Sequence, residues 1–431
     1  MDDSDFEVSV GMSRKWDARE AGREVARNTI RKLKRPPDFF LLFSTIHYEN
    51  NGGFKEFLNG VWDVLPEGIP LVGGTVAGFM NPDGCYTRGA SALAVSYPYM
   101  DVAIGVGKGT KKTPKRAARK CANNINKELS ASIYKNKFLF NIMAGARVPK
   151  LPFIGKRKAI KSNLLGKIMV IGFRMSNDLF GFGMGKEEFL IEELSKQLKN
   201  YHILGLSSTD NNQIMDYFQF HNKNVVHESV LGVGISTNLS VDILTTHGHI
   251  PFTNPLKIKF NPFFKTAVNK INGKPATEKI IEITNWSKKY LDEEIHRRSF
   301  YYPVLYVKDD EKTPATMGAF FGQNVILTHL VRDCDEIQLA YAFGRNLLDS
   351  AEKNIESYSD IKNDIKLPLI VSCGIRLNAL GNKVYVIHKM LSKFFRNKPF
   401  LVLYGSGENS YKPGGSPKHI NESFNTAVLG A

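Results

Sequence analysis

The sequence has few cysteines and no long apolar run. Its 431 residues include four cysteines, Cys85, Cys121, Cys334 and Cys373, and no two of them have CxxC spacing. A disulfide scaffold is therefore not expected, and a reducing compartment is favoured. The amino terminus is acidic and lacks the apolar segment of a signal peptide, and no window reaches the ~18 apolar residues of a membrane span. We expect a cytoplasmic protein without a transmembrane segment.

Motifs of several enzyme classes are also absent. There is no HExxH, no GxSxG and no complete phosphate-binding loop, because Glu187 stands where the glycine-rich string at 181–187 would need a hydroxyl. The close histidines His247 and His249 have no third ligand nearby in the sequence, which favours a structural or solvated pair over a metal site. We expect no metal and no enzyme. A nucleophilic Cys373 stays open, since a helix start and Arg376 would lower the pKa of its thiol.

Acidic residues are scarce in one part of the chain. The 58 basic and 42 acidic residues leave a net charge of 58 − 42 = +16, and the stretch 147–174 holds eight basic residues and no acid. Together with the cluster at 108–120, this surplus could hold an anionic membrane or nucleic acid. Leu151, Phe153, Ile154 and Leu165 lie among the basic residues and favour the membrane, whereas a solvated basic face is the plainer alternative. We expect 105–185 to be an irregular insertion, a flap or loop.

In the rest of the sequence one pattern of secondary-structure elements, helix–strand–helix–strand, occurs three times. The predicted elements are 17–33, 39–45, 54–65 and 69–75; then 114–130, 137–143, 186–199 and 201–209; then 337–356, 367–373, 382–396 and 398–407. The helices have one apolar face. Most strands are short, uninterrupted apolar runs, which is typical of strands that are buried on both faces of a sheet. The pattern predicts an α/β fold, with two related α/β lobes of mixed sheets and a carboxy-terminal part.

Small or polar residues end these strands and form the predicted ligand site. In open α/β sheets, ligands bind at the carboxyl ends of the strands, where small side chains leave backbone N–H groups accessible. Tight turns and structural ion pairs are the alternative interpretation of the same residues. The predicted ligand-binding residues are Gly73, Gly74, Thr75, Ser207, Ser208, His247, Cys373, Arg376 and Glu408.

The same segments carry a family resemblance that runs along most of the chain. DAREAGREVARNTI, PDFFLLFST and GIPLVGGTVAGF resemble the amino-terminal FIST domain, FIST N, and VDILTTHGHIPF is similar to its closing element, with Ile250 in place of an aromatic residue. INGKPATEKI resembles the opening of FIST C, with Asn272 in place of Asp. VSCGIR, LVLYGSGE and FNTAVLG resemble later FIST C signatures. The resemblance divides the chain into a FIST N-like part, 1–254, which holds the 105–185 insertion, and a FIST C-like part, 255–431.

The resemblance implies a sensory module that binds a small ligand, with amino acids as the suggested class. Some members bind haem, which would use a histidine such as His247 and would be non-covalent here, because no CxxCH occurs. No cofactor is otherwise expected. Subtracting the two FIST parts leaves no output domain, so the resemblance implies that signalling passes through a separate protein. The departures at Ile250 and Asn272 limit the transfer of individual residue roles.

Overall fold

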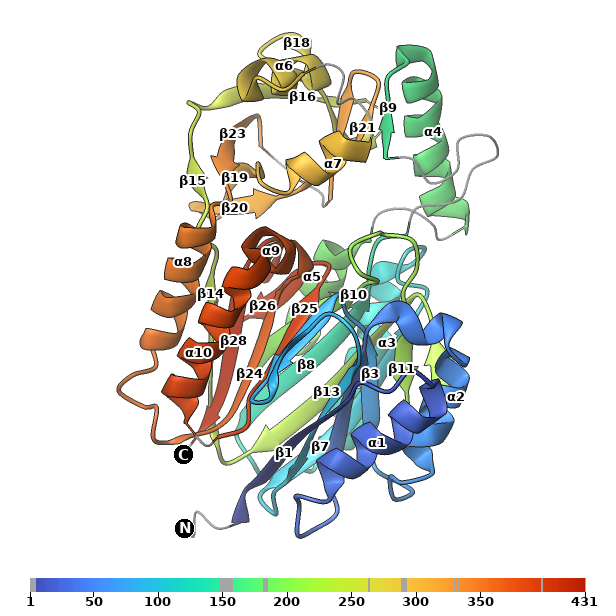
Figure 1. Ribbon diagram of the computed structural model, residues 1–431, viewed down its shortest axis with the longest axis vertical. Coiled ribbons are helices and arrows are strands. Elements are labelled where there is room, and N and C mark those ends of the chain that lie inside the picture. Colours follow the sequence, from blue (N-terminus) through green and yellow to red (C-terminus); the bar gives the residue numbers. More distant parts are fainter. Residues whose placement is uncertain are drawn as a thin grey trace.

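Three mixed β-sheets form the lower part of the molecule, and a fourth sheet lies above them (Figure 1). The computed structural model describes residues 5–147, 158–180, 185–262, 264–287, 293–328, 331, 334–396 and 398–430. We call the three lower sheets and their helices the body. The upper lobe comprises the fourth sheet and its helices, from the described residues of 158–180 and 250–341.

The first body sheet contains the two strands predicted at 39–45 and 69–75, which pair in parallel. Its strands, in spatial order, are β1 (Glu7–Ser13), β6 (Ala90–Ser96), β2 (Phe39–Ser44), β3 (Leu71–Thr75), β11 (Gln219–His221) and β12 (Asn224–Val226). Helices α1 (Ala18–Ile30) and α2 (Gly53–Trp62) flank it. The Asp17 side chain caps α1 by accepting a hydrogen bond from the Glu20 amide, which explains why the predicted helix begins there.

The second and third body sheets repeat this arrangement. The second contains, in spatial order, β27 (Lys418–Ile420), β26 (Glu408–Tyr411), β10 (Tyr201–Ser208), β8 (Asn136–Ala144), β13 (Ser229–Thr237) and β7 (Met100–Lys108), with helices α3 (Pro114–Glu128) and α5 (Glu187–Gln197). The third contains β14 (Ser240–Thr246), β28 (Phe424–Gly430), β24 (Ile365–Cys373), β25 (Leu401–Gly405), β4 (Gly78–Asn81) and β5 (Gly84–Tyr86), with helices α8 (Gly344–Glu356), α9 (Gly374–Leu380) and α10 (Val384–Phe395). The predicted α/β class with mixed sheets is confirmed.

Each body sheet and its helices form one repeat of the predicted pattern, and each sheet includes one hairpin that belongs to another repeat in the chain. Hairpin β11–β12 follows β10 in the chain but pairs with β3, hairpin β26–β27 follows β25 but pairs with β10, and hairpin β4–β5 follows β3 but pairs with β25. The three exchanges form a closed cycle, because every repeat gives one hairpin and receives one. Strands before and after residue 254 therefore pair with each other, while the division of the chain at that residue stays a prediction.

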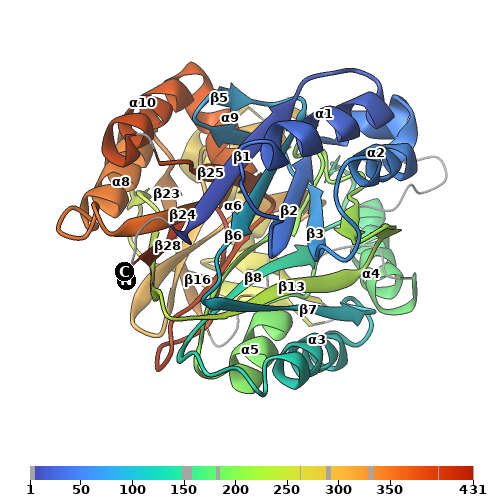
Figure 2. The ribbon, with the colours of Figure 1, turned by 90° about the horizontal axis from the view of Figure 1, so that it is seen from below.

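Apolar side chains between the three body sheets form the central core. Phe43, Phe140 and Val371, one from each sheet, are at most 1% exposed, and the rings of the two phenylalanines meet edge-on at 6.1 Å. Burying one such side chain contributes about 1.5–3 kcal/mol. Figure 2 shows the pairs α1/α2, α3/α5 and α8/α10 at three sides of the sheets, where they cover the outer faces.

The upper lobe is built mainly from a long insertion in the third repeat. Its sheet contains β20 (Glu311–Ala315), β19 (Val304–Lys308), β23 (Glu336–Tyr341), β16 (Leu256–Asn261), β17 (Phe264–Ile271), β22 (Asn324–Leu327), β21 (Met317–Phe321) and β9 (Ala159–Ile160), with β15 (Ile250–Pro251) and β18 (Lys274–Pro275) at its sides. Its helices are α4 (Asn163–Phe180), α6 (Ala276–Thr284) and α7 (Glu293–Ser299). The predicted helix at 337–356 is thus wrong in its first part: 336–341 forms strand β23, which buries Ile337 and Leu339 two positions apart on one face.

The basic segment is more regular than expected. The predicted helix 114–130 and strand 137–143 are confirmed as α3 and β8, and the interpretation of 163–180 as a flap or loop is wrong, because it forms α4. Met169, Val170 and Phe173 recur at helical spacing on the side that packs against the upper sheet, which explains the helix. Residues 148–157, with Leu151, Phe153 and Ile154, and residues 181–184 lie outside the described part. None of the helices in the described ranges is long and apolar enough to cross a membrane.

Candidate functional site

The carboxyl ends of β3, β10 and β25 meet at the centre of the body. We call residues 75–77, 207–209 and 404–407 the strand-end ring. Backbone hydrogen bonds close it: Thr209 N–H donates to the Thr75 carbonyl (3.0 Å), Ala77 N–H to Tyr404 (2.8 Å) and Ser406 N–H to Ser207 (3.0 Å). Each bond joins two different repeats, so the closed cycle of hairpins ends in a closed cycle of backbone contacts.

Five predicted site residues lie in or beside this ring and are buried there. The N–H groups of Thr75 and Ser207 already donate to the carbonyls of Phe218 (2.8 Å) and Gly407 (2.9 Å). Gly73 and Gly74 allow close packing of neighbouring strands, because a Cβ on Gly74 would lie 2.7 Å from the Ser208 Oγ. These glycines and amides therefore hold the three repeats together, which accounts for the small residues in the sequence.

A small cavity beside the ring is lined by Ser406, Cys373, Asn421 and loop residue Asn212, among others, and its volume is about 30 Å³. Since one water needs roughly 10–15 Å³ by this measure, the cavity has room for about two waters and excludes an amino acid.

Cys373 ends β24 and is 1% exposed. Burial raises the pKa of its thiol well above the ordinary value, and the nearby carboxyl groups of Glu408 and Glu422 raise it further. The prediction that a helix start and Arg376 lower this pKa is wrong, because burial and the two acids dominate. The thiol form is poorly suited to attack a substrate.

Glu408 is also fully enclosed. One carboxyl oxygen accepts hydrogen bonds from the Ser423 N–H (3.1 Å) and hydroxyl (2.8 Å), and its other oxygen has no hydrogen-bond partner in the described residues. Burial raises its pKa from 4.5 to about 8, against the opposing effect of the Ser423 bonds. Glu408 is therefore mainly neutral at pH 7.

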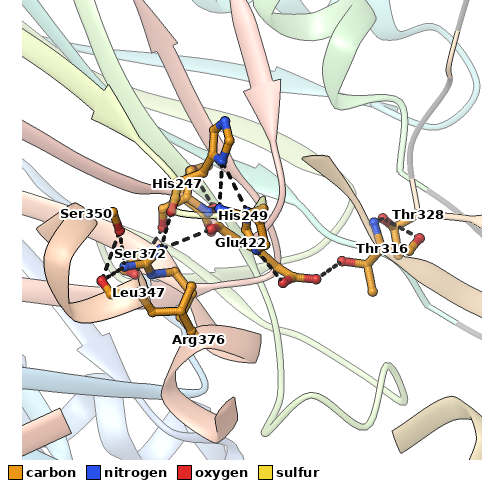
Figure 3. A network of polar contacts seen from close by, with 11 residues as sticks. His247, His249, Thr316, Thr328, Leu347, Ser350, Ser372, Arg376 and Glu422 are labelled. Carbon is orange, nitrogen blue, oxygen red and sulfur yellow. Dashed lines mark hydrogen bonds and ion pairs between the residues drawn. The ribbon is translucent and has the colours of Figure 1, made fainter. Parts of the chain in front are cut away.

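Arg376 is 1% exposed and joins three separate segments (Figure 3). Its guanidinium donates to the carbonyls of Leu347 (2.8 Å), His247 (3.2 Å) and Glu422 (3.3 Å), and to the Ser350 hydroxyl (3.2 Å). Burial lowers its pKa to about 10, so it stays charged at neutral pH. Because these four hydrogen bonds go to the protein itself, Arg376 acts as a clamp between α8, the turn before β28 and the segment after β14.

A chain of polar contacts links that clamp to the upper lobe (Figure 3). Glu422 lies between the two parts: one carboxyl oxygen is 2.9 Å from the His249 Nε2, and the other accepts from the Thr316 hydroxyl at 2.9 Å. The Thr328 hydroxyl bonds to the Asn421 side chain next to it. We call His249, Thr316, Thr328, Asn421 and Glu422 the lobe–body network.

An open cleft of about 910 Å³ lies on the same side as this network, between the body and the upper lobe. Its walls come from β14, β26 and α8 of the body, from the turn after β14, and from β20 with the residues before it. Five lysines and three acids line it: Lys308, Lys312, Lys353, Lys412, Lys418, Asp309, Glu311 and Asp349. His247 is the one predicted site residue that lines the cleft. The charged residues escaped prediction because they come from three segments, 308–312, 349–353 and 412–418, that lie 37 to 110 residues apart and share no motif.

The turn that forms one wall of the cleft depends on a glycine. Gly248 has φ +97°, and a Cβ there would lie 2.4 Å from the Asn346 carbonyl oxygen and 2.8 Å from the Ser350 hydroxyl. The sequence His-Gly-His is therefore explained by the close approach of this turn to α8, and His247 and His249 stack with ring centroids 5.3 Å apart.

Comparison with protein families matches the FIST N domain over residues 38–259, which is more than half of the chain. The chain belongs to the FIST family. Membership suggests a sensory or signal-transduction role with small-ligand binding, while a FIST C region over 255–431 stays a prediction. Comparison with curated proteins found no match.

Among solved structures, a cyanuric acid hydrolase from A. caulinodans is similar to this FIST protein at 8% sequence identity and a TM-score of 0.27. The similarity covers 55% of this chain and 72% of the other. At that TM-score the likeness carries no argument about fold or chemistry.

The histidine considered for haem is already engaged in this FIST chain. His247 accepts from the His249 N–H through Nδ1 (3.1 Å), and its Nε2 lies 3.1 Å from the Lys312 carbonyl oxygen, which leaves neither ring nitrogen open to an iron. Burial lowers its pKa to about 4, so the ring is neutral at pH 7. In the described ranges no group of three or more His, Cys, Asp or Glu side chains could hold a metal.

A second buried polar cluster, which sequence reasoning missed, adjoins Ser207. The Ser207 hydroxyl donates to Glu187 at the start of α5 (3.2 Å), and the Lys111 ammonium lies 5.3 Å from the Tyr217 ring centre. Burial raises the pKa of Glu187 to about 7 and lowers that of Lys111 to about 8. Ser207 is thereby tied to α5.

Proposed function

We propose that this FIST protein is a sensor that binds a small zwitterion, an amino acid, in the cleft between the body and the upper lobe. The observation that supports this most is the cleft itself: about 910 Å³, lined by side chains of both charges. Small-molecule sites commonly enclose about 300–1,000 Å³ and carry a few polar groups that fix the ligand. The cavity at the strand-end ring, at about 30 Å³, is too small for such a ligand.

The charges of the cleft suit the two ends of an amino acid. Lys353 and Lys312 would receive the carboxylate, and Asp349 on the neighbouring turn of α8 would receive the ammonium. His247 is neutral at pH 7 and both of its ring nitrogens are engaged, so it would contribute an apolar ring face rather than charge. The ordered backbone at the turn of Gly248 gives this wall a fixed shape, which limits the entropy lost on binding.

A ligand in this cleft would contact the body and the upper lobe at once, and this is how we propose that binding becomes a signal. It shifts the populations of lobe arrangements only if its affinity differs between them. The lobe–body network, with Glu422 between His249 and Thr316, is the contact such a shift would alter. We propose that a separate protein reads the change and that the compartment is the cytoplasm, where the four free cysteines would stay reduced.

Isothermal titration with a panel of the standard amino acids tests the proposal. At least one should give a saturable heat with one site per chain. Lys353→Glu should weaken that binding about tenfold or more, since it replaces a charge-assisted bond with repulsion. The matched control is Lys389→Glu, the same reversal at an exposed position of α10 outside the cleft. Silence across the panel, or an equal affinity of the two variants, would refute the assignment.

A further inference from the structure

Helix α4 presents a stripe of exposed apolar side chains. They recur at helical spacing along one side of the helix, where large apolar residues are ordinarily buried. The stripe consists of Leu164 (71% exposed), Leu165 (45%), Ile168 (56%), Ile171 (49%) and Met175 (54%).

The opposite side of α4 is firmly packed. Met169, Val170 and Phe173 are at most 4% exposed and contact the apolar residues of β17, β21 and β22. Gly166 lets the backbones approach closely, because a Cβ there would lie 2.5 Å from the Gly322 nitrogen. The helix is therefore held by one side and displays the other, at the outer edge of the upper lobe (Figure 1).

Basic residues accompany the stripe. Lys161 and Lys167 are exposed beside it, and Arg174, seven residues after Lys167, is exposed as well. The sequence from 147 to 174 holds eight basic residues and no acid. An apolar stripe edged by lysine and arginine on a short helix is typical of helices that lie in the plane of a membrane surface.

We infer that α4 is an interfacial helix that docks the protein on an anionic lipid surface. Leu164, Ile168 and Ile171 would enter the boundary between headgroups and acyl chains, and Lys161 and Lys167 would contact the lipid phosphates. The charge favours lipid over a second copy of this chain, since two copies of a segment without acids would repel each other across the stripe.

Sedimentation with lipid vesicles tests this inference. The protein should bind vesicles of phosphatidylcholine with phosphatidylserine much more strongly than phosphatidylcholine alone, and the preference should fall as salt is raised. The double variant Ile168→Glu, Ile171→Glu should lose binding to both. Lys161→Glu with Lys167→Glu should reduce the anionic preference about tenfold or more. Ile133→Glu, at an 84% exposed isoleucine before β8, is the matched control and should bind as the wild type does.

Two outcomes would overturn the inference. The first is no binding of the wild type to anionic vesicles at low salt. The second is a concentration-dependent dimer in light scattering that Ile168→Glu, Ile171→Glu abolishes while vesicle binding stays absent or unchanged, which would assign the stripe to a second copy. Unchanged circular dichroism and melting temperature would show that the variants are folded. Lys161→Glu with Lys167→Glu leaves the apolar packing of α4 intact and therefore tests the attraction to anionic lipid separately.

Discussion

Replacing Glu408 by glutamine should change how the stability of the protein depends on pH. The side chain is fully buried, and burial raises its pKa from 4.5 to about 8. The unfolded chain would release this proton near pH 4.5, whereas the folded protein holds it up to about pH 8. Glutamine has nearly the same shape and carries no titrating group.

The size of the effect follows from these two values. The pKa in the folded protein lies about 3.5 above 4.5, and each pH unit between them corresponds to ~1.36 kcal/mol. The unfolded state binds fewer protons in this interval, so the contribution of Glu408 to the free energy of unfolding is present below pH 4.5 and is lost progressively up to pH 8. Over that range, the wild type should lose about 4–5 kcal/mol relative to Glu408→Gln.

Urea unfolding of both proteins at pH 5, 6, 7, 8 and 9 measures this difference, because other groups that titrate over roughly this range contribute equally to both proteins and cancel in the subtraction. The gap in the free energy of unfolding should shift in favour of Glu408→Gln by about 1.4 kcal/mol per pH unit up to pH 8 and then level off. A gap that does not vary with pH would refute a raised pKa for Glu408 and would place a charged carboxylate at the ring.

Two further predictions concern the turn and the lobe–body contact. Gly248→Ala should lower the free energy of unfolding by about 2–4 kcal/mol in urea titrations, because the residue has φ +97° and the new Cβ would meet the Asn346 carbonyl oxygen at 2.4 Å; an unchanged midpoint would contradict this close approach. Thr316→Val should cost about 1–3 kcal/mol and speed amide hydrogen exchange in the upper lobe, because it leaves an oxygen of Glu422 buried without its donor. Wild-type exchange rates there would show that the bond does not hold the lobe.

Much of the body could be predicted from the sequence, because its elements are local patterns. The apolar runs that became β2, β8 and β24 are continuous, and the helices that cover them have one apolar face. The exchange of hairpins could not be predicted. Strands β4, β11 and β26 have only three or four residues, and their partners lie in other repeats, so their pairing is decided by the whole fold rather than by local preference.

The candidate site was predicted only in part, for a related reason. Small residues at strand ends point equally to accessible donors and to close packing, and Gly73, Gly74 and Ser207 serve the packing here. Arg376 could be predicted as a polar residue near a strand end. Its hydrogen-bond partners at Leu347 and His247 are set by the tertiary structure, because they are distant in the sequence. The cleft lies between the inserted upper lobe and the body, and no motif or spacing in the sequence predicts that these two parts lie side by side.

Native mass spectrometry of the purified protein tests most directly whether the cleft holds a small ligand. The comparison is between the wild type, Asn346→Trp, which would fill part of the cleft from α8, and Glu356→Trp, which changes an exposed side chain at the end of the same helix that does not line the cleft. We expect a small-molecule adduct on the wild type and on Glu356→Trp, and its loss from Asn346→Trp. No adduct on any of the three, or the same adduct on all of them, would contradict it.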